Sequence, residues 1–325
     1  MPKQKHQVTN LAEYNQGLRR RGDLTVWISD EALGMWSAAR RTTRGGQPRY
    51  SDLAIELCLT LGMLFKQPLR QTQGFMRGIT GILGVEIAVP DFSTLSRWGN
   101  GVILQTSPRA DKQAAIRLVV DSTCLKIFGK GEWLEEKHKT KRKRRSWRKL
   151  HLGLDLVSGE IVSSDLTTDE VGDPTALPGL LDQVDGPVAL FLAPLSDASI
   201  ACRAMDGAYD GEPTSDLLAA RFGSMIEVTI PPPKTAILSA IAGQDSTARD
   251  CHIADIAARG RMAWQKASGY NQRSRGETLM GRWKAVIGPK LKARAFEKQK
   301  TEAKIGVRVL NRMTELGRPQ FERTA

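Results

Sequence analysis

The sequence predicts an α/β protein in which a mixed β-sheet is flanked by helices and preceded by an all-α N-terminal region. Up to residue 108 the apolar residues have helical spacing, and after it they form short apolar or alternating runs typical of strands. Three of these runs precede an alternation of helical and strand-like segments, which favours a mixed sheet covered by helices. We therefore divide the chain into a helical region, residues 1–112, and a second domain, residues 113–325, that ends in basic helices.

The helical region contains three capped segments in succession. Ser51 is placed to cap a helix that ends near Phe65. A second helix, Leu69 to Ile79, leads through glycines to a third, which is capped by Asp91 or Ser93. This order has the outline of a helix-turn-helix, and an ordinary three-helix bundle fits the sequence as well.

The second domain begins with the run from Ile116 to Asp121, an expected strand that closes on an acidic residue. Ser158-Gly159 is a turn signal between two alternating runs and predicts a hairpin. The other expected elements are strands over 150–156 and 160–166, a helix over 173–181, and strands over 188–193, 199–202 and 225–230.

Lysine and arginine outnumber aspartate and glutamate by 48 − 35 = 13, which suits a polyanionic partner such as nucleic acid. The four cysteines lack paired C-x-x-C spacing, and the four histidines complete no zinc-binding pattern. The N-terminus lacks the apolar core of a signal peptide, and the apolar segment 53–65 is too short to span a bilayer. We therefore expect a cytoplasmic protein with reduced thiols and no membrane association.

Glu277 is a lone carboxylate within a basic stretch of the sequence. Side chains three, four and seven residues apart share one face of a helix. One side of such a helix would carry Tyr270, Arg273, Glu277 and Lys284. An exposed helix with Arg–Glu pairs, each contributing about 0.3 kcal/mol, explains this stretch equally well on its own.

Two further acidic residues are candidates for a common site with Glu277. Asp121 is expected at the end of the first strand, where a side chain can project into a cleft, and Asp206 follows a later strand beside Gly207. Three carboxylates in one cleft repel one another unless divalent cations neutralise them, and Mg²⁺ or Mn²⁺ suits such oxygen ligands. Two ions about 3.5–4 Å apart can activate a water or a 3′-hydroxyl and stabilise the leaving oxygen at phosphorus. Each aspartate taken singly is more often a turn residue or a cap, so the inference depends on all three together.

The spacing within the basic stretch reproduces the pattern Y-x2-R-x3-E-x6-K, in Tyr270, Arg273, Glu277 and Lys284. In this pattern the chain resembles bacterial insertion-sequence transposases of the DDE type. Further stretches are similar to the insertion-sequence-five group of that family, and the resemblance runs from about residue 50 to residue 317. They are Val120-Asp121-Ser-Thr, Trp147 to Asp155, Asp206-Gly-Ala-Tyr-Asp-Gly, Pro231-Pro-Pro-Lys and Lys304 to Met313.

The resemblance implies a ribonuclease-H-like catalytic domain preceded by a helical DNA-binding region. It also implies a catalytic, metal-binding triad of Asp121, Asp206 and Glu277, with Mg²⁺ or Mn²⁺ as the cofactor. The DNA backbone at the element's end would be held by Tyr270, Arg273 and Lys284, whose side chains suit phosphate. The implied reaction is hydrolysis that frees a 3′-hydroxyl at the element's end, followed by attack of that hydroxyl on target DNA. We expect a homo-oligomer on paired ends.

The sequence departs from the family between residues 194 and 205, which separate the strand over 188–193 from Asp206. Either this segment is an insertion, or its second half has become the strand. A displacement of Asp206 by about 1 Å would lower the rate about 100-fold, so Asp210 and Asp197 are alternatives for the second ligand.

A dense basic run, residues 137–149, lies between two expected strands. We interpret it as a phosphate-binding segment, and a solvated hairpin face is the alternative. The side chain of Arg97 in the third N-terminal helix either reads bases or only packs. The expected DNA-binding residues outside the late helix are Lys141, Arg142, Lys143, Arg144, Arg145, Arg148 and Arg97.

Three functions are compatible with the sequence. The first is DNA transposition, the second is non-catalytic binding of element ends by an inactivated transposase, and the third is metal-dependent nuclease activity without strand transfer. Mg²⁺-dependent cleavage of element ends separates the first from the second. Joining of the released 3′-end to a target separates the first from the third.

Overall fold

The computed structural model describes residues 5–28, 30–42, 44–98, 113–127, 147–194, 209–240, 242–244 and 246–324. The chain forms two compact units. Met1–Ser107 and Ala295–Ala325 make up the first, which we call the helical unit, and Pro108–Arg294 make up the second, the sheet unit.

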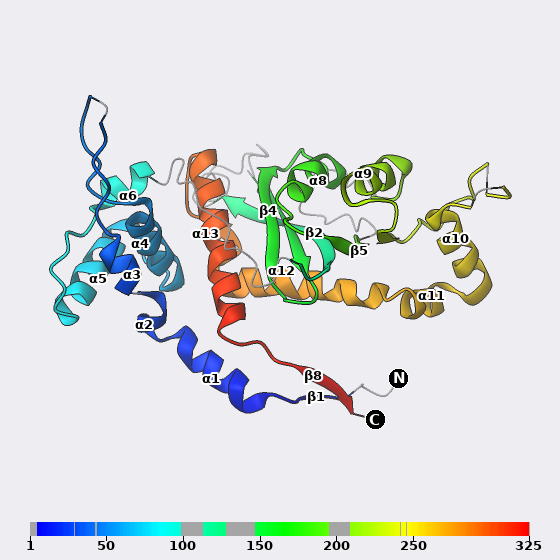
Figure 1. Ribbon diagram of the computed structural model, residues 1–325, viewed down its shortest axis with the longest axis horizontal. Coiled ribbons are helices and arrows are strands. Elements are labelled where there is room, and N and C mark those ends of the chain that lie inside the picture. Colours follow the sequence, from blue (N-terminus) through cyan, green and yellow to red (C-terminus); the bar gives the residue numbers. More distant parts are fainter. Residues whose placement is uncertain are drawn as a thin grey trace, which may run out of the picture. The chain divides into compact units, whose positions relative to one another are not determined.

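The sheet unit is built on a mixed β-sheet (Figure 1). Its strands are β2 (Ile116–Ile127), β3 (Trp147–Asp155), β4 (Ile161–Thr168), β5 (Val188–Leu192), β6 (Glu227–Thr229) and β7 (Lys290–Leu291). The order is β4-β3-β2-β5-β6, and β7 pairs with the end of β2. β3 is antiparallel to β2 and β4, whereas β5 is parallel to β2 and β6 is parallel to β5. An antiparallel meander extended by parallel strands beyond its first strand is the ribonuclease-H-like arrangement, so the predicted fold class is confirmed.

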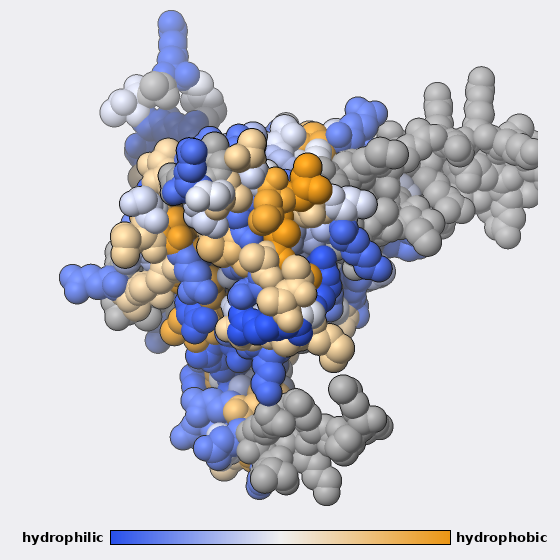
Figure 2. All heavy atoms as spheres, turned by 90° about the vertical axis from the view of Figure 1, so that its right-hand side faces the viewer, coloured by the Kyte–Doolittle hydropathy of each residue, from blue (hydrophilic) through white to orange (hydrophobic). Residues whose placement is uncertain are grey.

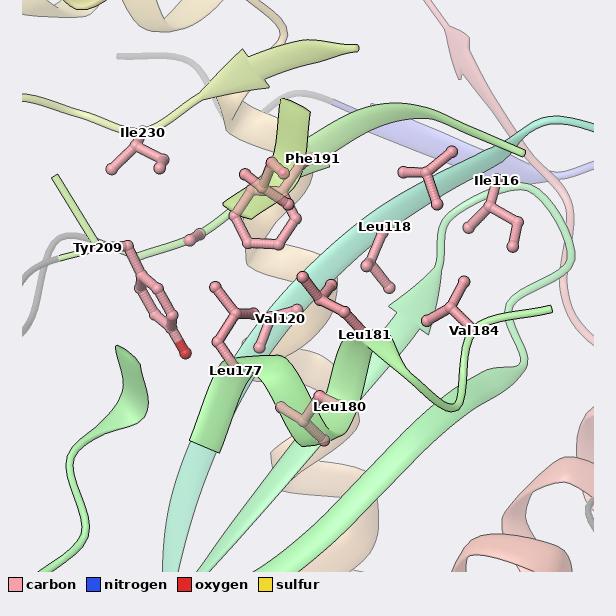
Figure 3. Close-up of a cluster of buried hydrophobic side chains, with 13 residues drawn as sticks. Ile116, Leu118, Val120, Leu177, Leu180, Leu181, Val184, Phe191, Tyr209 and Ile230 are labelled. Atoms are coloured by element: carbon pink, nitrogen blue, oxygen red, sulfur yellow. The ribbon is translucent and has the colours of Figure 1, made fainter. Parts of the chain in front are cut away.

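The helical segments of this unit are α8 (Asp173–Leu181), α9 (Glu212–Phe222), α10 (Ala248–Arg259), α11 (Arg261–Ala267), the 3-10 helix η1 (Tyr270–Arg273) and α12 (Ser274–Val286). Successive side chains of a strand point to opposite faces of a sheet. On one face, Leu118 and Val120 of β2 pack with Leu177 of α8 in the core shown in Figure 3. Val119 points to the opposite face, where α12 packs against β2.

The β3–β4 hairpin turns at Ser158-Gly159, where the sequence predicted a turn. Gly159 has φ +74°, a conformation that favours glycine. The Asp155 carboxylate accepts hydrogen bonds from the backbone N–H of Val157 and of Ser158, each at 3.1 Å, and from the Ser158 hydroxyl at 2.7 Å. These contacts satisfy the turn at Ser158-Gly159, which confirms the predicted hairpin.

The helical unit contains β1 (Lys5–Val8), α1 (Leu11–Arg21), α2 (Leu24–Trp27), α3 (Asp30–Gly34), α4 (Asp52–Leu64), α5 (Leu69–Ile82), α6 (Phe92–Trp98), α13 (Phe296–Glu315) and β8 (Phe321–Thr324). The Ser51 hydroxyl accepts from the backbone N–H of Ala54 at 3.1 Å, as predicted. Of the two caps considered for α6, Asp91 accepts from the N–H of Thr94 at 2.7 Å. Both contacts stabilise helix starts by satisfying N–H groups that lack an intrahelical partner.

The C-terminal residues pack with the helical unit, whereas the sequence assigned them to the second domain. α13 packs against α4, and Arg308 of α13 forms an ion pair with Glu56 of α4. β8 pairs antiparallel with β1, in a register that places Val8 opposite Phe321. Helical periodicity identifies the apolar face of α13 but does not identify which helix that face contacts.

Several expectations fall on residues outside the described ranges. These residues are 195–208, which include Asp197, Asp206 and the expected strand 199–202, and 128–146, which include the five basic positions 141–145. In the part of the chain that is described, no helix has the length and apolar character needed to cross a membrane. Figure 2 shows one face of the molecule, on which hydrophilic side chains surround a smaller group of apolar ones.

Candidate active site

Asp121 lies in the middle of β2, paired across the ladder with Leu152 of β3. The sequence placed it at the end of the strand, and this was wrong, because β2 continues to Ile127 and pairs with β3 as far as Lys126. The Asp121 side chain is half-buried, and its Oδ1 accepts from the N–H of Ser122 at 2.8 Å. Because β2 and its ladder with β3 continue beyond Asp121 in both directions, this carboxylate is held more rigidly than it would be at a strand end.

A glycine brings α12 close to Asp121. A Cβ atom at Gly276 would lie 3.3 Å from Oδ2 of Asp121 and 3.2 Å from Cγ1 of Val119, both closer than ordinary van der Waals contact. The helix therefore rests directly on β2 at this level, and Glu277 is the next residue along it. In this way the structure brings together two of the three predicted catalytic carboxylates.

The electrostatics of Asp121 reflect this crowding. Burial raises the pKa of its carboxyl group from 3.8 to about 6. The N–H of Ser122 and the positive charge of Arg273 oppose the rise, while the negative charges of Asp173 and Glu277 add to it. A bound cation strongly stabilises the ionised form of a desolvated carboxylate that lies beside other carboxylates.

Arg273 forms an ion pair with Glu277, four residues later in the sequence. The Arg273 side chain is 14% exposed and the Glu277 side chain 60%, so the acid reaches the surface while the guanidinium is mostly buried. The Arg–Glu pair expected of a merely exposed helix is thus present, but it lies beside Asp121.

The sequence predicted that Tyr270 lies on the same α-helical face as Glu277, but the structure places Tyr270 before the α-helix begins. It belongs to η1, is only 8% exposed, and packs with its ring centroid 5.5 Å from that of Trp264. The Cζ atom of Arg273 lies 5.9 Å from the Tyr270 ring centroid, within range of a cation–π contact. Tyr270 therefore supports the arginine with its ring, while Lys284 is exposed further along α12.

A buried charged cluster, which the sequence did not predict, lies on the opposite face of β2. Oδ1 of Asp173, in the first turn of α8, lies 3.0 Å from Nζ of Lys149 and 3.0 Å from Nδ1 of His151. The Ser122 hydroxyl donates to Oδ2 of the same aspartate at 3.1 Å. Burial acts to raise the pKa of Asp173, but the contacts with His151 and Lys149 outweigh it and hold that pKa below its ordinary value. We call Ser122, Lys149, His151 and Asp173 the buried cluster.

A sequence signal for this cluster does exist. Lys149 and His151 are two residues apart in an expected strand, so both point to the same face of the sheet. Both are at most 1% exposed, and buried charged residues are rare unless they are paired. The partner, Asp173, lies on a helix distant in sequence, and only the fold identifies it.

The remaining predicted residues are spread over the two units. Arg97 is exposed on α6, and Arg148 is half-buried on β3, where its guanidinium donates to the carbonyl of Trp147 at 3.1 Å. Asp210, an alternative second ligand, has a 5% exposed side chain and an ion pair with Arg249 at 2.8 Å. Within the described ranges no group of three or more His, Cys, Asp or Glu residues is positioned to hold a metal ion. Asp121 and Glu277 supply two carboxylates of the kind that Mg²⁺ and Mn²⁺ prefer.

The family of this protein follows from comparison with known sequences. Residues 112–312 match a family model described as a transposase DDE domain, and residues 19–130 match a second model with the same description. The first match spans more than half of the chain, which therefore belongs to the DDE transposases. The protein is accordingly a DNA transposase, and members of this family depend on divalent metal ions.

A crystal structure of a pre-cleavage Mos1 transpososome also matches, over 88% of this chain and 84% of that chain, with 12% sequence identity. The TM-score of 0.21 is too low for that superposition to support a structural argument.

Proposed function

We propose that Asp121, Asp206 and Glu277 together bind the divalent ions used by this transposase. The ions would serve to cleave the element's ends and to transfer the freed 3′-hydroxyl to target DNA. The supporting observation is the approach of α12 to β2 at Gly276, the residue before Glu277, next to the half-buried carboxylate of Asp121. When bound, Mg²⁺ or Mn²⁺ activates the attacking oxygen and stabilises the charge on the leaving oxygen.

The chain's own residues prepare the site for this chemistry. Asp121 is held by the ladder between β2 and β3 and is desolvated, so it must lose its proton before it can act as a ligand. Arg273 holds Glu277 in the absence of DNA, and a phosphate of the element's end can then compete for the same guanidinium fork. Tyr270 acts through Arg273 as a positioning residue, since its buried ring lies against the guanidinium.

Further cations of the chain would hold the DNA backbone. We assign this role to Lys284, Arg148 and Arg97, and to the basic positions Lys141, Arg142, Lys143, Arg144 and Arg145. Arg97 is exposed on α6, which packs with α4 and α5, and a helix of such a three-helix group can enter a DNA groove.

The triad is tested by Asp121→Asn, Asp206→Asn and Glu277→Gln. Each is expected to abolish Mg²⁺-dependent cleavage of a labelled element end while binding of that end is retained. Asp255→Asn is the matched control, because Asp255 is an exposed carboxylate that also pairs with an arginine four residues away. Retained cleavage in the Asp121 or Glu277 variant would overturn the assignment, whereas retained cleavage in the Asp206 variant alone would move the second ligand to Asp197 or Asp210.

The same assay decides among the functions left open by the sequence. End binding without cleavage by the unaltered chain would identify an inactivated transposase. Cleavage without joining of the 3′-end to a target plasmid would identify a nuclease. Parallel titrations with Mg²⁺ and Mn²⁺ identify the more effective ion.

We also propose a homo-oligomer on paired ends, in the bacterial cytoplasm. Mass photometry of the chain with one end and with two ends tests the oligomer. A species that contains two ends and at least two chains is expected, and a single chain on each end would contradict it.

A further inference from the structure

An arginine-rich arm projects from the helical unit between α3 and α4. Ser37 and Tyr50 form an antiparallel bridge, the N–H of Ala38 donates to the carbonyl of Arg49 at 3.3 Å, and the two sides of the loop run together (Figure 1). Further out, the side-chain amide of Gln47 accepts from the N–H of Arg41 at 2.8 Å and donates to its carbonyl at 3.1 Å. We call residues 37–42 and 44–50 the arm.

The base of the arm is anchored immediately before α6. The indole of Trp36, which is 3% exposed, donates to the carbonyl of Ala88 at 2.7 Å. The Tyr50 hydroxyl donates to the carbonyl of the next residue, Val89, at 3.2 Å. Asp91, which caps α6, follows two residues later. The arm and the helix that carries Arg97 are therefore held on one short segment of chain.

The arm carries positive charge without any acidic residue. Residues 37–50 contain four arginines, Arg40, Arg41, Arg44 and Arg49, and no aspartate or glutamate. All four are exposed, and among the described residues none of their guanidinium groups takes part in an ion pair. Like charges on one short segment repel one another, and salt at physiological strength screens that repulsion only beyond about 8 Å. An anion bound between them would relieve it.

The composition of the arm indicates which kind of polyanion it fits. Protein interfaces are anchored by large apolar or aromatic side chains, and residues 37–49 contain none. They contain arginine, threonine, glycine and backbone N–H groups, which are the donors that bind DNA phosphates.

We propose that the arm binds the sugar-phosphate backbone of DNA beside the stretch of duplex that α6 contacts. This inference rests on the proposed function in taking DNA as the polyanion and in assigning Arg97 of α6 to it, and it does not depend on the catalytic triad. Because phosphate contacts position a protein without reading bases, the arm would set affinity and register and leave sequence preference to α6.

The test measures the salt dependence of DNA binding by fluorescence anisotropy. The full chain is titrated onto a labelled duplex of unrelated sequence in EDTA, so that neither cleavage nor element ends enter the result. For Arg41→Gln combined with Arg44→Gln, we expect weaker binding and a shallower slope of log K against log salt. The slope should fall by about 2, because each phosphate that the protein no longer neutralises reduces it by about 0.9.

Two further variants make the result decisive. Arg221→Gln combined with Arg259→Gln removes the same charge from exposed arginines that pair with Asp182 and Asp255, and it is expected to keep the original slope. Arg41→Lys combined with Arg44→Lys keeps the charge and is expected to restore most of the slope. An unchanged slope in the arm variant, or an equal reduction in the arginine control, would overturn the proposal. Failure of the triad variants to abolish cleavage, in a chain whose arm variant shows the reduced slope, would instead concern the proposed function alone.

Discussion

Ser122, the residue after Asp121 in β2, donates its hydroxyl to Oδ2 of Asp173 at the start of α8, 3.1 Å away. Asp121 and Ser122 point to opposite faces of the sheet. The Asp121 carboxylate therefore faces α12, whereas the Ser122 hydroxyl is hydrogen-bonded to α8 on the other face. The buried cluster thereby links the strand that carries Asp121 to the helix that covers the other face.

Asp173→Asn is predicted to destabilise the sheet unit, because it leaves the charge of Lys149 buried without its counter-ion. We expect a loss of about 3 kcal/mol in the free energy of unfolding, measured by urea denaturation, together with slower cleavage. Asp182→Asn is the control, since Asp182 ends the same helix with a 72% exposed side chain and should change stability by less than about 0.5 kcal/mol. Equal stability of the two variants would contradict the structural role of the cluster.

Gly276→Ala is predicted to lower the cleavage rate about 10-fold to 100-fold. The added methyl group would lie 3.2 Å from Val119 and 3.3 Å from Asp121, so α12 and Glu277 must shift by a few tenths of an ångström. Gly281→Ala lies on the same helix and meets nothing within 4 Å. It should retain activity and gain about 0.5–1 kcal/mol of stability from better helix propensity. Equal activity of the two variants would show that close helix packing does not matter for the reaction.

The raised pKa of Asp121 predicts a pH-dependent cost of folding in the absence of metal. Its pKa is about 6 in the folded chain and 3.8 when unperturbed, so the stability present below pH 3.8 is lost as the pH rises through 6. In EDTA, Asp121→Asn should therefore be more stable than the unaltered chain at pH 7.5, by about 3 kcal/mol, and equally stable near pH 3.5. Denaturation at a series of pH values measures this difference, and a difference that does not vary with pH would refute it. Added Mg²⁺ should reduce the difference at pH 7.5.

The ion pair between Glu56 of α4 and Arg308 of α13 predicts how the C-terminal helix is held. Burial raises the pKa of Glu56 despite the opposing charge of Arg308, so the carboxylate depends on its partner. Arg308→Met should destabilise the helical unit by about 2 kcal/mol, and adding Glu56→Gln should recover part of that loss. A double-mutant cycle in urea tests this, and strictly additive effects would show that the pair contributes nothing.

Local features of the fold could be read from the sequence because they depend on neighbouring residues. The cap at Ser51, the turn at Ser158-Gly159 and the helix over 173–181 each follow from side chains that bond to nearby backbone or repeat with a fixed period. The spacing from Tyr270 to Lys284 likewise identified the family before any contact was known.

What the sequence determined by itself was therefore the class of fold, the family and the three carboxylates Asp121, Asp206 and Glu277 as candidates. Only the tertiary structure decided that Asp121 lies within a strand, that Gly276 brings α12 onto it, and that Asp173 joins Lys149 and His151 beneath it. The physical reason is that such contacts depend on strand register and on which helix covers which face, and residues distant in the chain settle both. Burial then sets the charge state of each group, and burial is a property of the folded chain alone.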